Sequence, residues 1–341
     1  MKSKQKILVI RNDKLGDFML AWPALALLRK NLPQAHIAVL VPSYTAPLAE
    51  ACSYIDEVII DPKLKGEWSN GRALAKLLKL KKFDAVITLF SRFDTGLGVW
   101  LAGIPRRYAP ATKLARVFYN RRILQRRSRS EKPEYEYNQD IARIFLEEQG
   151  IVEPKAVMPP YLAFEPKVIA RLKRNFMQAH KIPAEKKLVF VHPGHGGSAT
   201  NLSLAHYAGF IRALVMHKTQ HIVLTAGPGE EAQAQQLADL LLNEPHTLYI
   251  SDKGLLDFAR HLQFCDLFVS GSTGPLHIAG ALNCRTAAFY PRRRSSTALR
   301  WQTVNAPDRR MAFEPPEGSD ESDMQAIDLT LAAAIINKQY L

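Results

Sequence analysis

Short apolar runs alternate with amphipathic segments through the first 90 residues of the chain. The runs have the length of strands, and they predict β-strands at 6–10, 36–41, 56–61 and 84–90. The amphipathic segments repeat their apolar positions every three or four residues, and they predict helices at about 18–31 and 72–83. Continuous apolar strands separated by helices are typical of a parallel sheet that is covered on both faces.

The same alternation begins again after residue 186. Apolar runs predict strands at 187–194, 221–227, 266–271 and 286–291. The segments between and beside them predict helices at about 203–217, 230–242, 255–264 and 276–282. Between the two halves, residues 153–166 contain four prolines, which fix φ and remove backbone donors, so this stretch is expected to be a linker.

The 341 residues exceed what one hydrophobic core usually holds, so we expect two domains, 1–160 and 161–322. Both domains are predicted to be α/β and Rossmann-like, and they are expected to face each other across a cleft. In open parallel sheets, ligands bind beyond the carboxyl ends of the strands. The loops that follow the predicted strands are therefore the first candidates for a functional site.

The net charge of +14 and the pI of about 9.7 favour anionic partners, whether nucleic acid, an anionic membrane or a phosphorylated substrate. No nucleic acid is expected, because known nucleic-acid motifs are absent and the basic residues are not interleaved with an aromatic platform.

No apolar run approaches the ~20 residues that span a bilayer. The first apolar run, KILVI, predicts a strand instead of a signal peptide, so a cytoplasmic location is expected. Cys52, Cys265 and Cys284 form no metal-ligand pattern and are expected to be free thiols.

The loop Arg11–Asp17, with the sequence RNDKLGD, follows the first predicted strand. Gly16 allows a ligand to approach the backbone, and Asp13 and Asp17 place two carboxylates at the predicted cleft. Asp17 also stands at the start of the next helix, which a carboxylate stabilises by capping. Two roles are open for Asp17, a helix cap and a general base that takes the proton of a hydroxyl nucleophile.

The loop His192–Asn201 is rich in small residues, which are Gly194, Gly196, Gly197 and Ser198. Such a loop lets backbone N–H groups approach an anion, and a plain turn is the alternative interpretation. The loop lacks the GK[ST] ending of a Walker loop, and it is not the GxGxxG fingerprint of a dinucleotide fold.

The segment Ser270–Leu282, with the sequence SGSTGPLHIAGAL, contains a strand end, a turn and a helix start. Pro275 suits the first turn of a helix, and Ser272 or Thr273 could cap that helix. The free N–H groups and the positive dipole of this helix start suit a diphosphate. His277 lies in the first turn, where it either donates to a phosphate or packs in the core.

Glu230 and Glu231 follow the predicted strand 221–227 and a Gly-Pro-Gly turn. At the start of a helix, both carboxylates would complement the helix dipole. The alternative is that Glu230 accepts hydrogen bonds from the hydroxyls of a bound sugar such as ribose.

Four stretches, in this order, resemble glycosyltransferase family 9, the family of the ADP-heptose:lipopolysaccharide heptosyltransferases. They are ILVIRNDKLGDFMLAWPALALLRKNLP, VFVHPGHGGSATNLSLAHYAGF, LTAGPGEEAQAQQL and VSGSTGPLHIAGALNCRTAAFYP. The resemblance covers nearly the whole chain and implies the GT-B fold, with an N-terminal domain for the acceptor and a C-terminal domain for the nucleotide sugar. It also implies that residues 323–341 form a C-terminal helix that packs back on the N-terminal domain.

The resemblance also implies roles for individual residues. Asp17, in the LGD motif, matches the presumed catalytic base of the family. Glu230 matches an acid that contacts the donor nucleoside. The implied donor-binding residues are Gly194, Gly197, Ser198, Thr200, Glu230, Ser272, Thr273, Gly274 and His277.

Two residues depart from the family pattern at this implied donor site. Thr200 stands where several heptosyltransferases have Lys or Arg, and Ser272 stands where some have Asp. A basic residue in the loop would neutralise a pyrophosphate, so another cation is expected to replace it. The candidate replacements are Lys14, Arg11 and the run Arg292–Arg294, and Asp13 is a further secondary site candidate.

The resemblance implies one inverting displacement, in which Asp17 removes a proton from the acceptor and the helix start at Ser272–His277 stabilises the leaving diphosphate. The implied donor is ADP-heptose, and the implied acceptor is a lipopolysaccharide core or a related lipid-linked saccharide. No DxD-type pair with supporting ligands is present, so neither a metal nor a cofactor is expected. The alternatives are a different nucleotide sugar and a non-catalytic protein that binds nucleotide sugar.

Residues 95–130 hold nine Lys or Arg and no acid. The candidates for contact with an acceptor or a membrane are Arg106, Arg107, Lys113, Arg116, Arg121 and Arg122. The segment is either a solvated surface loop or a surface that attracts lipid-borne phosphates. In the second case, the protein is expected to bind peripherally at the cytoplasmic face of the inner membrane.

Overall fold

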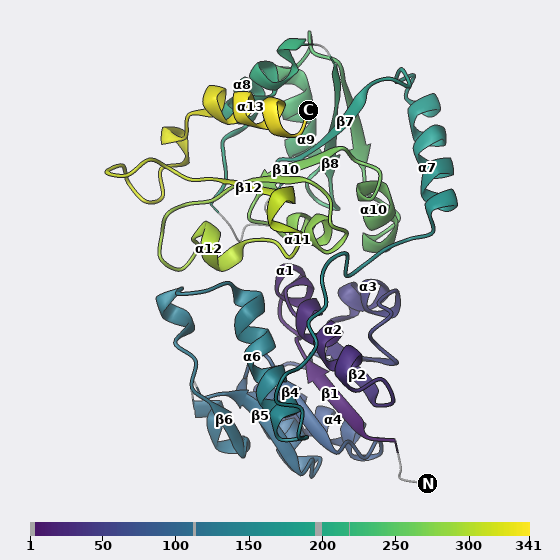
Figure 1. The fold of residues 1–341 in the computed structure, drawn as a ribbon, viewed down its shortest axis with the longest axis vertical. Coiled ribbons are helices and arrows are strands. Elements are labelled where there is room, and N and C mark those ends of the chain that lie inside the picture. Colours follow the sequence, from purple (N-terminus) through teal and green to yellow (C-terminus); the bar gives the residue numbers. More distant parts are fainter. Residues whose placement is uncertain (1–3, 112–113, 195–199, 218) are drawn as a thin grey trace. The chain divides into compact units, whose positions relative to one another are not determined.

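The computed structural model describes residues 4–111, 114–194, 200–217 and 219–341. The chain divides into two compact units, which Figure 1 traces from purple to yellow. The first unit comprises the residues up to Arg127 together with Glu131–Tyr161, and the second comprises Ser128–Ser130 and Leu162–Leu341. The main boundary falls in the proline-rich stretch, within one residue of the position expected from the sequence.

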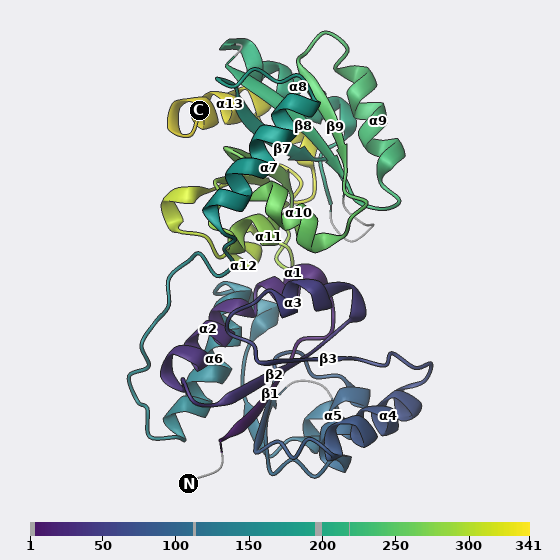
Figure 2. The same ribbon diagram turned by 90° about the vertical axis from the view of Figure 1, so that its right-hand side faces the viewer.

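Within its described residues, the first unit is built on a six-stranded parallel sheet with the order β3-β2-β1-β4-β5-β6. The strands are β1 (Lys6–Ile10), β2 (His36–Val41), β3 (Glu57–Ile60), β4 (Ala85–Thr88), β5 (Arg106–Pro110) and β6 (Arg121–Ile123). The helices are α1 (Leu15–Met19), α2 (Trp22–Asn31), α3 (Ala46–Glu50), α4 (Glu67–Lys79), α5 (Phe93–Leu101) and α6 (Glu134–Glu147). Helices α2 and α6 pack together on one face of the sheet, and α4 and α5 pack together on the other (Figure 2).

The central strand β1 explains why the apolar runs in the sequence are continuous. Residues Ile7 to Ile10 are all buried, because helices cover both faces of the sheet. In the register of the sheet, Ile10 lies beside Leu40 of β2 and Thr88 of β4. The order of the strands reverses between β1 and β4, so the loop after β1 begins at the topological switch point, where open α/β sheets bind ligands.

The described part of the second unit repeats this topology in a six-stranded parallel sheet with the order β12-β11-β10-β7-β8-β9. The strands are β7 (Lys187–His192), β8 (Gln220–Ala226), β9 (His246–Ile250), β10 (Leu267–Gly271), β11 (Thr286–Phe289) and β12 (Arg310–Phe313). The helices are α7 (Pro166–Ala179), α8 (Leu204–Leu214), α9 (Glu231–Leu240), α10 (Leu255–Leu262), α11 (Gly274–Ala281), α12 (Ala298–Trp301) and α13 (Leu329–Gln339). Ser270 pairs with His192 in the register, so the loops after β7 and β10 start side by side at the switch point.

Short 3-10 helices join these elements: η1 (Ser43–Thr45), η2 (Leu114–Phe118), η3 (Arg127–Arg129), η4 (Val215–His217), η5 (Pro307–Arg309) and η6 (Met324–Ala326). All three cysteines are free. Among the helices of the described ranges, none is long and apolar enough to cross a bilayer.

Four strands, β5, β6, β9 and β12, were not predicted by the apolar pattern. They lie at or next to the edges of the two sheets, and each carries partly exposed residues. An edge strand needs no continuous apolar run, because its outer side is not covered in the same way as that of a central strand. The basic segment is therefore not simply a surface loop, since it contains β5, η2, β6 and η3.

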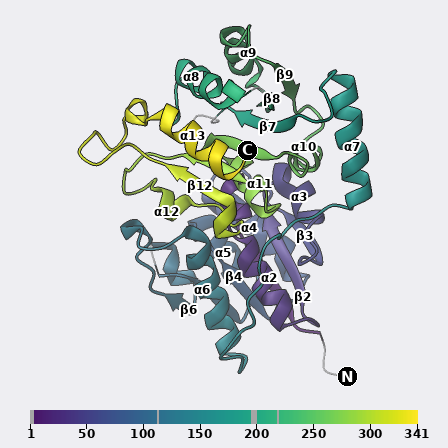
Figure 3. The same cartoon turned by 45° about the horizontal axis from the view of Figure 1, so that its top comes forward.

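The prediction that residues 323–341 pack back on the N-terminal domain is wrong. Helix α13 packs on α8 inside the second unit (Figure 3). Its residues Ala332, Ala333 and Ile336 are part of the core of that unit. An apolar stripe shows that a helix is buried on one side, but it does not show which element covers that side.

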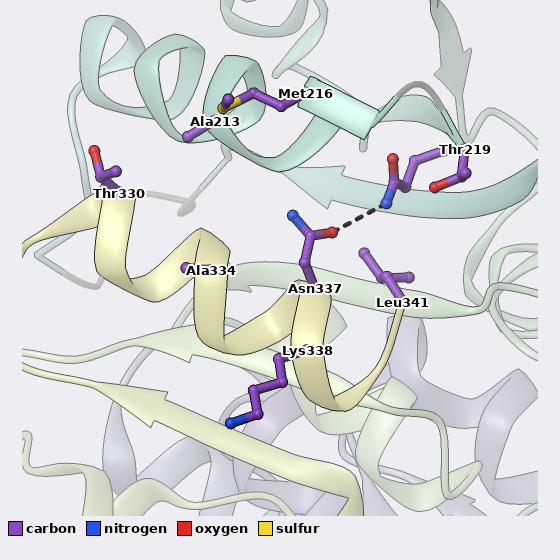
Figure 4. A pocket seen from close by; sticks show the side chains of 9 residues that line it. Ala213, Met216, Thr219, Thr330, Ala334, Asn337, Lys338 and Leu341 are labelled. Carbon is purple, nitrogen blue, oxygen red and sulfur yellow. Dashed lines mark hydrogen bonds between the residues drawn. The ribbon is translucent and has the colours of Figure 1, made fainter.

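Side-chain hydrogen bonds fix α13 in this position (Figure 4). The amide oxygen of Asn337 accepts from Gln220 Nε2 at 3.0 Å, and its Nδ2 donates to the Leu214 carbonyl at 3.0 Å. Beside this contact, α8, β8 and α13 line a pocket that contains none of the site residues expected from the sequence.

Ile336→Ala is expected to lower the free energy of unfolding by about 2–4 kcal/mol, because it deletes a fully buried side chain and leaves a cavity. The matched control is Leu331→Ala on the same helix, where the side chain is 56% exposed and the cost should be within about 0.5 kcal/mol. Chemical denaturation measures both values. Equal effects of the two substitutions would show that α13 is not docked through this face.

Candidate active site

The loop after β1 holds one buried guanidinium among three carboxylates. Arg11 Nε lies 2.9 Å from Asp13 Oδ1, and Arg11 Nη1 lies 3.2 Å from Glu134 Oε1. Nη2 of the same side chain pairs with Asp17 Oδ1. Nη1 also donates to the amide oxygen of Asn138 at 3.2 Å. Since Glu134 and Asn138 belong to α6, these bonds fasten the loop to that helix.

The charges in this cluster shift each other's protonation. Burial opposes the charge of Arg11, but the surrounding carboxylates outweigh it and raise the pKa of the guanidinium. Burial raises the pKa of Asp17 to about 6 against the attraction of Arg11, and the charges of Asp13 and Glu134 add to the rise. A carboxylate whose pKa lies near the operating pH is suited to act as a general base.

Asp17 does not act as the helix cap that the sequence left open. It lies in the first turn of α1, but that helix has no side-chain cap bond, and the carboxylate is bound to Arg11 instead. Lys14, at the N-cap position, is exposed. The suggestion that Arg11 neutralises a pyrophosphate is wrong, because its guanidinium is buried and already bound to three carboxylates.

Sequence reasoning missed Glu134, and it missed a second salt bridge to that residue. Arg127 Nη1 lies 2.6 Å from the same Glu134 oxygen that pairs with Arg11. The only sequence signal was an acid in the first turn of a helix after Pro133, which also fits an ordinary dipole interaction. The distance of more than a hundred residues between Arg11 and Glu134 hides their pairing from any local pattern.

A second buried polar network lies next to this loop and was also missed. Asn12 Nδ2 donates to Asp61 Oδ2 at 2.6 Å, and Asn70 Nδ2 donates to Asp61 Oδ1 at 3.2 Å. Asn70 Nδ2 also donates to Asp94 Oδ2 at 2.9 Å. These bonds join the loops after β1 and β3 to α4 and α5, and they hold the backbone beside Arg11 in place.

In the second unit, Asn201 connects the loops after β7 and β10. Its Nδ2 donates to the Pro193 carbonyl at 2.9 Å, and its Oδ1 accepts from the Tyr207 hydroxyl at 2.8 Å. A Cβ atom at Gly271 would lie 2.5 Å from this Oδ1, so the end of β10 needs a glycine for the contact. The predicted glycine-rich loop is thus anchored at its end by Asn201.

The Glu230 side chain lies directly over Gly194. Its carboxylate accepts from the Gly227 N–H at 3.0 Å, and a Cβ atom at Gly194 would lie 2.3 Å from Oε1. Glu230 Oε2 is also 3.4 Å from Nε2 of the buried His192. Burial lowers the pKa of His192, although the Glu230 carboxylate favours the charged imidazole. The side chain does not cap α9, so the carboxylate projects toward the loop after β7.

The start of α11 has the features of an anion site. Thr273 occupies the N-cap position with extended backbone, but the helix has no side-chain cap bond, and Thr273 Oγ1 donates to Ser270 Oγ at 3.5 Å. Pro275 lies in the first turn and carries no N–H. The remaining first-turn N–H groups, beginning with that of Gly274, can therefore bind a phosphate.

His277, one turn into α11, is buried. Its Nδ1 has no hydrogen-bond partner among the described residues. Burial lowers the pKa of His277 to about 4, so the imidazole is neutral near pH 7 and can donate one hydrogen bond without carrying a charge. The two interpretations of this residue, core packing and phosphate contact, are compatible in the structure.

The other predicted site residues are scattered. Thr200 is exposed and Ser272 is half-buried. Gly197, Ser198 and Lys113 lie outside the described residues. No group of three or more His, Cys, Asp or Glu that could hold a metal occurs in the part of the chain that the structure describes.

Several of the predicted acceptor or membrane cations have structural roles. Arg107 Nε donates to the Phe118 carbonyl at 2.7 Å, and Arg122 Nε donates to the Tyr119 carbonyl at 2.9 Å. Arg121 forms a salt bridge with Glu148 at 2.9 Å. The Arg106 guanidinium lies 5.8 Å from the ring centre of Phe145, and Arg116 is exposed.

Two parallel sheets with helices on both faces, and anion-binding features at the switch point of the second, define a GT-B glycosyltransferase fold. A structure of Escherichia coli ADP-heptose lps heptosyltransferase II matches with a TM-score of 0.77 and 20% identity, covering 98% of this chain and 99% of that chain. A structure of E. coli heptosyltransferase WaaC with ADP matches with a TM-score of 0.73 and 18% identity, covering 98% of this chain and all of that chain.

Sequence comparison defines the family. The model of glycosyltransferase family 9 (heptosyltransferase) matches residues 71–309. A protein of Haemophilus influenzae named "Putative glycosyltransferase" is 48% identical over 98% of this chain and 96% of its own length. E. coli lipopolysaccharide heptosyltransferase 2 is 25% identical over 84% of this chain and 82% of its own length. The chain belongs to glycosyltransferase family 9, and it is a glycosyltransferase.

The difference in unfolding free energy between Asp17→Asn and wild type is expected to shift in favour of the variant as the pH rises from 4 to above 6. The folded-state pKa of about 6 exceeds the unfolded value of about 4, so the native state binds more protons in this window and wild type loses stability as pH rises. Two pH units correspond to about 3 kcal/mol as an upper limit. Urea unfolding across this range measures the difference, with the exposed Asp239→Asn as control. A difference that does not change with pH would contradict the raised pKa.

Gly194→Ala is expected to lower the free energy of unfolding by about 1–3 kcal/mol, because the new methyl group displaces the Glu230 carboxylate. Gly209→Ala is the matched control. Gly209 lies in α8 and is exposed, with no atom within 4 Å of the added Cβ, so this change should raise stability by up to about 1 kcal/mol. Thermal unfolding compares the two variants, and a neutral Gly194→Ala would refute the close packing of Glu230.

Proposed function

We propose that this family 9 glycosyltransferase transfers heptose from ADP-heptose to a lipopolysaccharide core or a related lipid-linked saccharide, with inversion at the anomeric carbon. The observation that carries the proposal is Asp17, a carboxylate that is paired with Arg11 at the switch point of the first sheet and whose pKa is raised to about 6. The names of the relatives support heptose as the sugar and the acceptor class, since several are lipopolysaccharide or lipooligosaccharide heptosyltransferases.

In the proposed reaction, Asp17 accepts the proton of the acceptor hydroxyl while that oxygen attacks the anomeric carbon. The bond between this carbon and the diphosphate breaks, and the pair of electrons leaves with the diphosphate. The N–H groups and the dipole at the start of α11 stabilise the growing negative charge, and neutral His277 can donate one further hydrogen bond. The proposed reaction uses no metal ion.

The other residues of the second unit are proposed to bind the donor. Glu230 accepts hydrogen bonds from the ribose hydroxyls, and its carboxylate is positioned by the Gly227 N–H. The loop after β7, which ends with Thr200 and Asn201, faces the diphosphate in this proposal. Because Thr200 supplies no charge there, Lys14 or one of Arg292–Arg294 is proposed to neutralise the diphosphate.

Two alternatives remain as outcomes of the tests. The departures at Thr200 and Ser272 favour a nucleotide sugar other than ADP-heptose as the second candidate. A non-catalytic protein that binds nucleotide sugar is disfavoured by the buried cluster of Arg11 and Asp17, because a raised carboxylate pKa serves a proton transfer and costs stability. We also propose that the enzyme works as a peripheral protein at the cytoplasmic face of the inner membrane, without a nucleic-acid partner.

A thermal-shift screen with ADP, UDP, GDP, CDP, ADP-heptose and UDP-glucose tests the donor. ADP and ADP-heptose are expected to raise the melting temperature selectively, because a ligand that binds only the folded state stabilises it. In a transfer assay, Asp17→Asn should then lower kcat by at least about a hundredfold, while the ADP shift stays. Transfer should also persist in EDTA. A selective shift with UDP compounds would replace the donor, and the absence of any shift would favour the non-catalytic alternative.

A further inference from the structure

Four aromatic rings form a chain across the α4, α5 and η2 region of the first unit. The ring centres of Trp68 and Phe93 are 5.2 Å apart, and those of Phe93 and Phe118 are 5.3 Å apart. Trp100 continues the chain, with its ring 6.0 Å from that of Phe118. Helices α4 and α5, which carry three of these rings, pack side by side (Figure 2).

This chain of rings is only half covered by protein. Trp68 is 60% exposed and Trp100 is 50% exposed. On η2, which packs on α5, Leu114 is 86% exposed and Val117 is 63% exposed. We call these six residues, including Phe93 and Phe118, the aromatic surface. Single exposed apolar side chains are ordinary, whereas a large contiguous group of them is typical of an interaction site.

The charges beside the aromatic surface are mainly positive. Arg72 lies one helical turn from Trp68 on α4, Arg116 lies between Leu114 and Val117 on η2, and both are exposed. Of the acids in α4, α5 and η2, Glu67 is exposed, whereas Asp94 is buried and paired with Arg92. The partner should therefore have an apolar layer that contacts the aromatic surface and, next to it, an anionic layer that contacts the arginines.

We propose that the aromatic surface docks on an anionic lipid bilayer, with Trp68, Trp100, Leu114 and Val117 inserted at the boundary between headgroups and acyl chains. Tryptophan is enriched at this depth, because its ring is apolar and its N–H reaches the polar layer. Arg72 and Arg116 then lie at the level of the lipid phosphates, and each basic residue near an anionic membrane strengthens binding.

A second copy of the chain is the less favoured occupant. A two-fold dimer through this surface would bring the same arginines of both copies together, and like charges across an interface oppose association. A bilayer instead supplies the opposite charge. The inference deepens the proposed function and rests on it for the lipid-borne acceptor, because it names the surface through which the enzyme reaches that acceptor.

Flotation of the full-length protein with phosphatidylcholine vesicles, with and without phosphatidylglycerol, tests the proposal. Wild type is expected to float with the anionic vesicles, and Trp68→Ser combined with Trp100→Ser should weaken this binding by at least about tenfold. Leu114→Gln combined with Val117→Gln should act in the same direction without loss of packing, because both side chains are highly exposed. Leu242→Ser, an 80% exposed apolar side chain of the second unit, is the matched control and should leave binding unchanged.

Brominated lipids give an independent measurement of insertion. The chain has four tryptophans, of which Trp22 is fully buried, and quenching should disappear when Trp68 and Trp100 are replaced by Phe. Arg72→Glu combined with Arg116→Glu should remove the preference for anionic vesicles. The proposal is overturned if wild type does not float, if the aromatic variants float like the control, or if those variants instead dissociate a dimer in analytical ultracentrifugation.

The failure of this inference can be told apart from the failure of the proposed function. The aromatic variants should keep the thermal shift with ADP and the transfer rate to a delipidated acceptor saccharide, since the six residues are outside the proposed catalytic and donor sites. If nucleotides do not shift the wild type but the vesicle results hold, the proposed function is wrong and the membrane surface stands. If the nucleotides shift it and the vesicles do not bind, only the membrane surface is wrong.

Discussion

The first unit depends on one buried guanidinium. Arg11 neutralises part of the charge of three carboxylates, and without it the partly buried Asp13 and Asp17 and the buried Glu134 would repel each other at short range. The same cation joins the loop after β1 to α6, so the position of Asp17 is set by a salt bridge. Burial prevails over the attraction of Arg11 at Asp17, and the charges of Asp13 and Glu134 add to it, so the pKa of Asp17 rises. The same group of contacts thus fastens the loop and raises the pKa of Asp17, the proposed base.

The second unit has the same sheet topology as the first, but its candidate site is built differently. The order of its strands also reverses where the loops of the candidate site begin, between β10 and β7. This candidate site depends on backbone N–H groups and on the room that glycines leave, instead of on a buried cluster of charges. Gly194 leaves room for the Glu230 carboxylate, and Gly271 leaves room for Asn201. The first turn of α11 keeps its N–H groups uncapped. An anion with several oxygens is best met by such fixed dipoles, which need no rearrangement when the charge develops.

The arginines that contribute to the high positive charge of the chain have several different roles in the structure. Arg11 is buried among three carboxylates, and Arg107 and Arg122 bind backbone carbonyls. Only part of the basic segment is therefore able to attract an external anion, and net charge alone overstates that attraction. Arg116 is exposed beside the aromatic surface, so its position gives it a role that its neighbours in the sequence do not share.

The sequence by itself determined the two parallel sheets, the linker and the loops of the site, because central strands such as β1 must be apolar throughout and turns such as that before α11 need particular residues. The tertiary structure decided the edge strands, the docking of the last helix and the long-range contacts, because no local sequence pattern contains them. Edge strands such as β6 have no continuous apolar run, and α13 has an apolar stripe that fits more than one neighbour. The partnership of Arg11 with Glu134, the room at Gly194 for Glu230 and the meeting of Trp68 with Phe93 join residues far apart in the chain. Such contacts depend on side-chain geometry in the folded state, and for this reason only the fold reveals them.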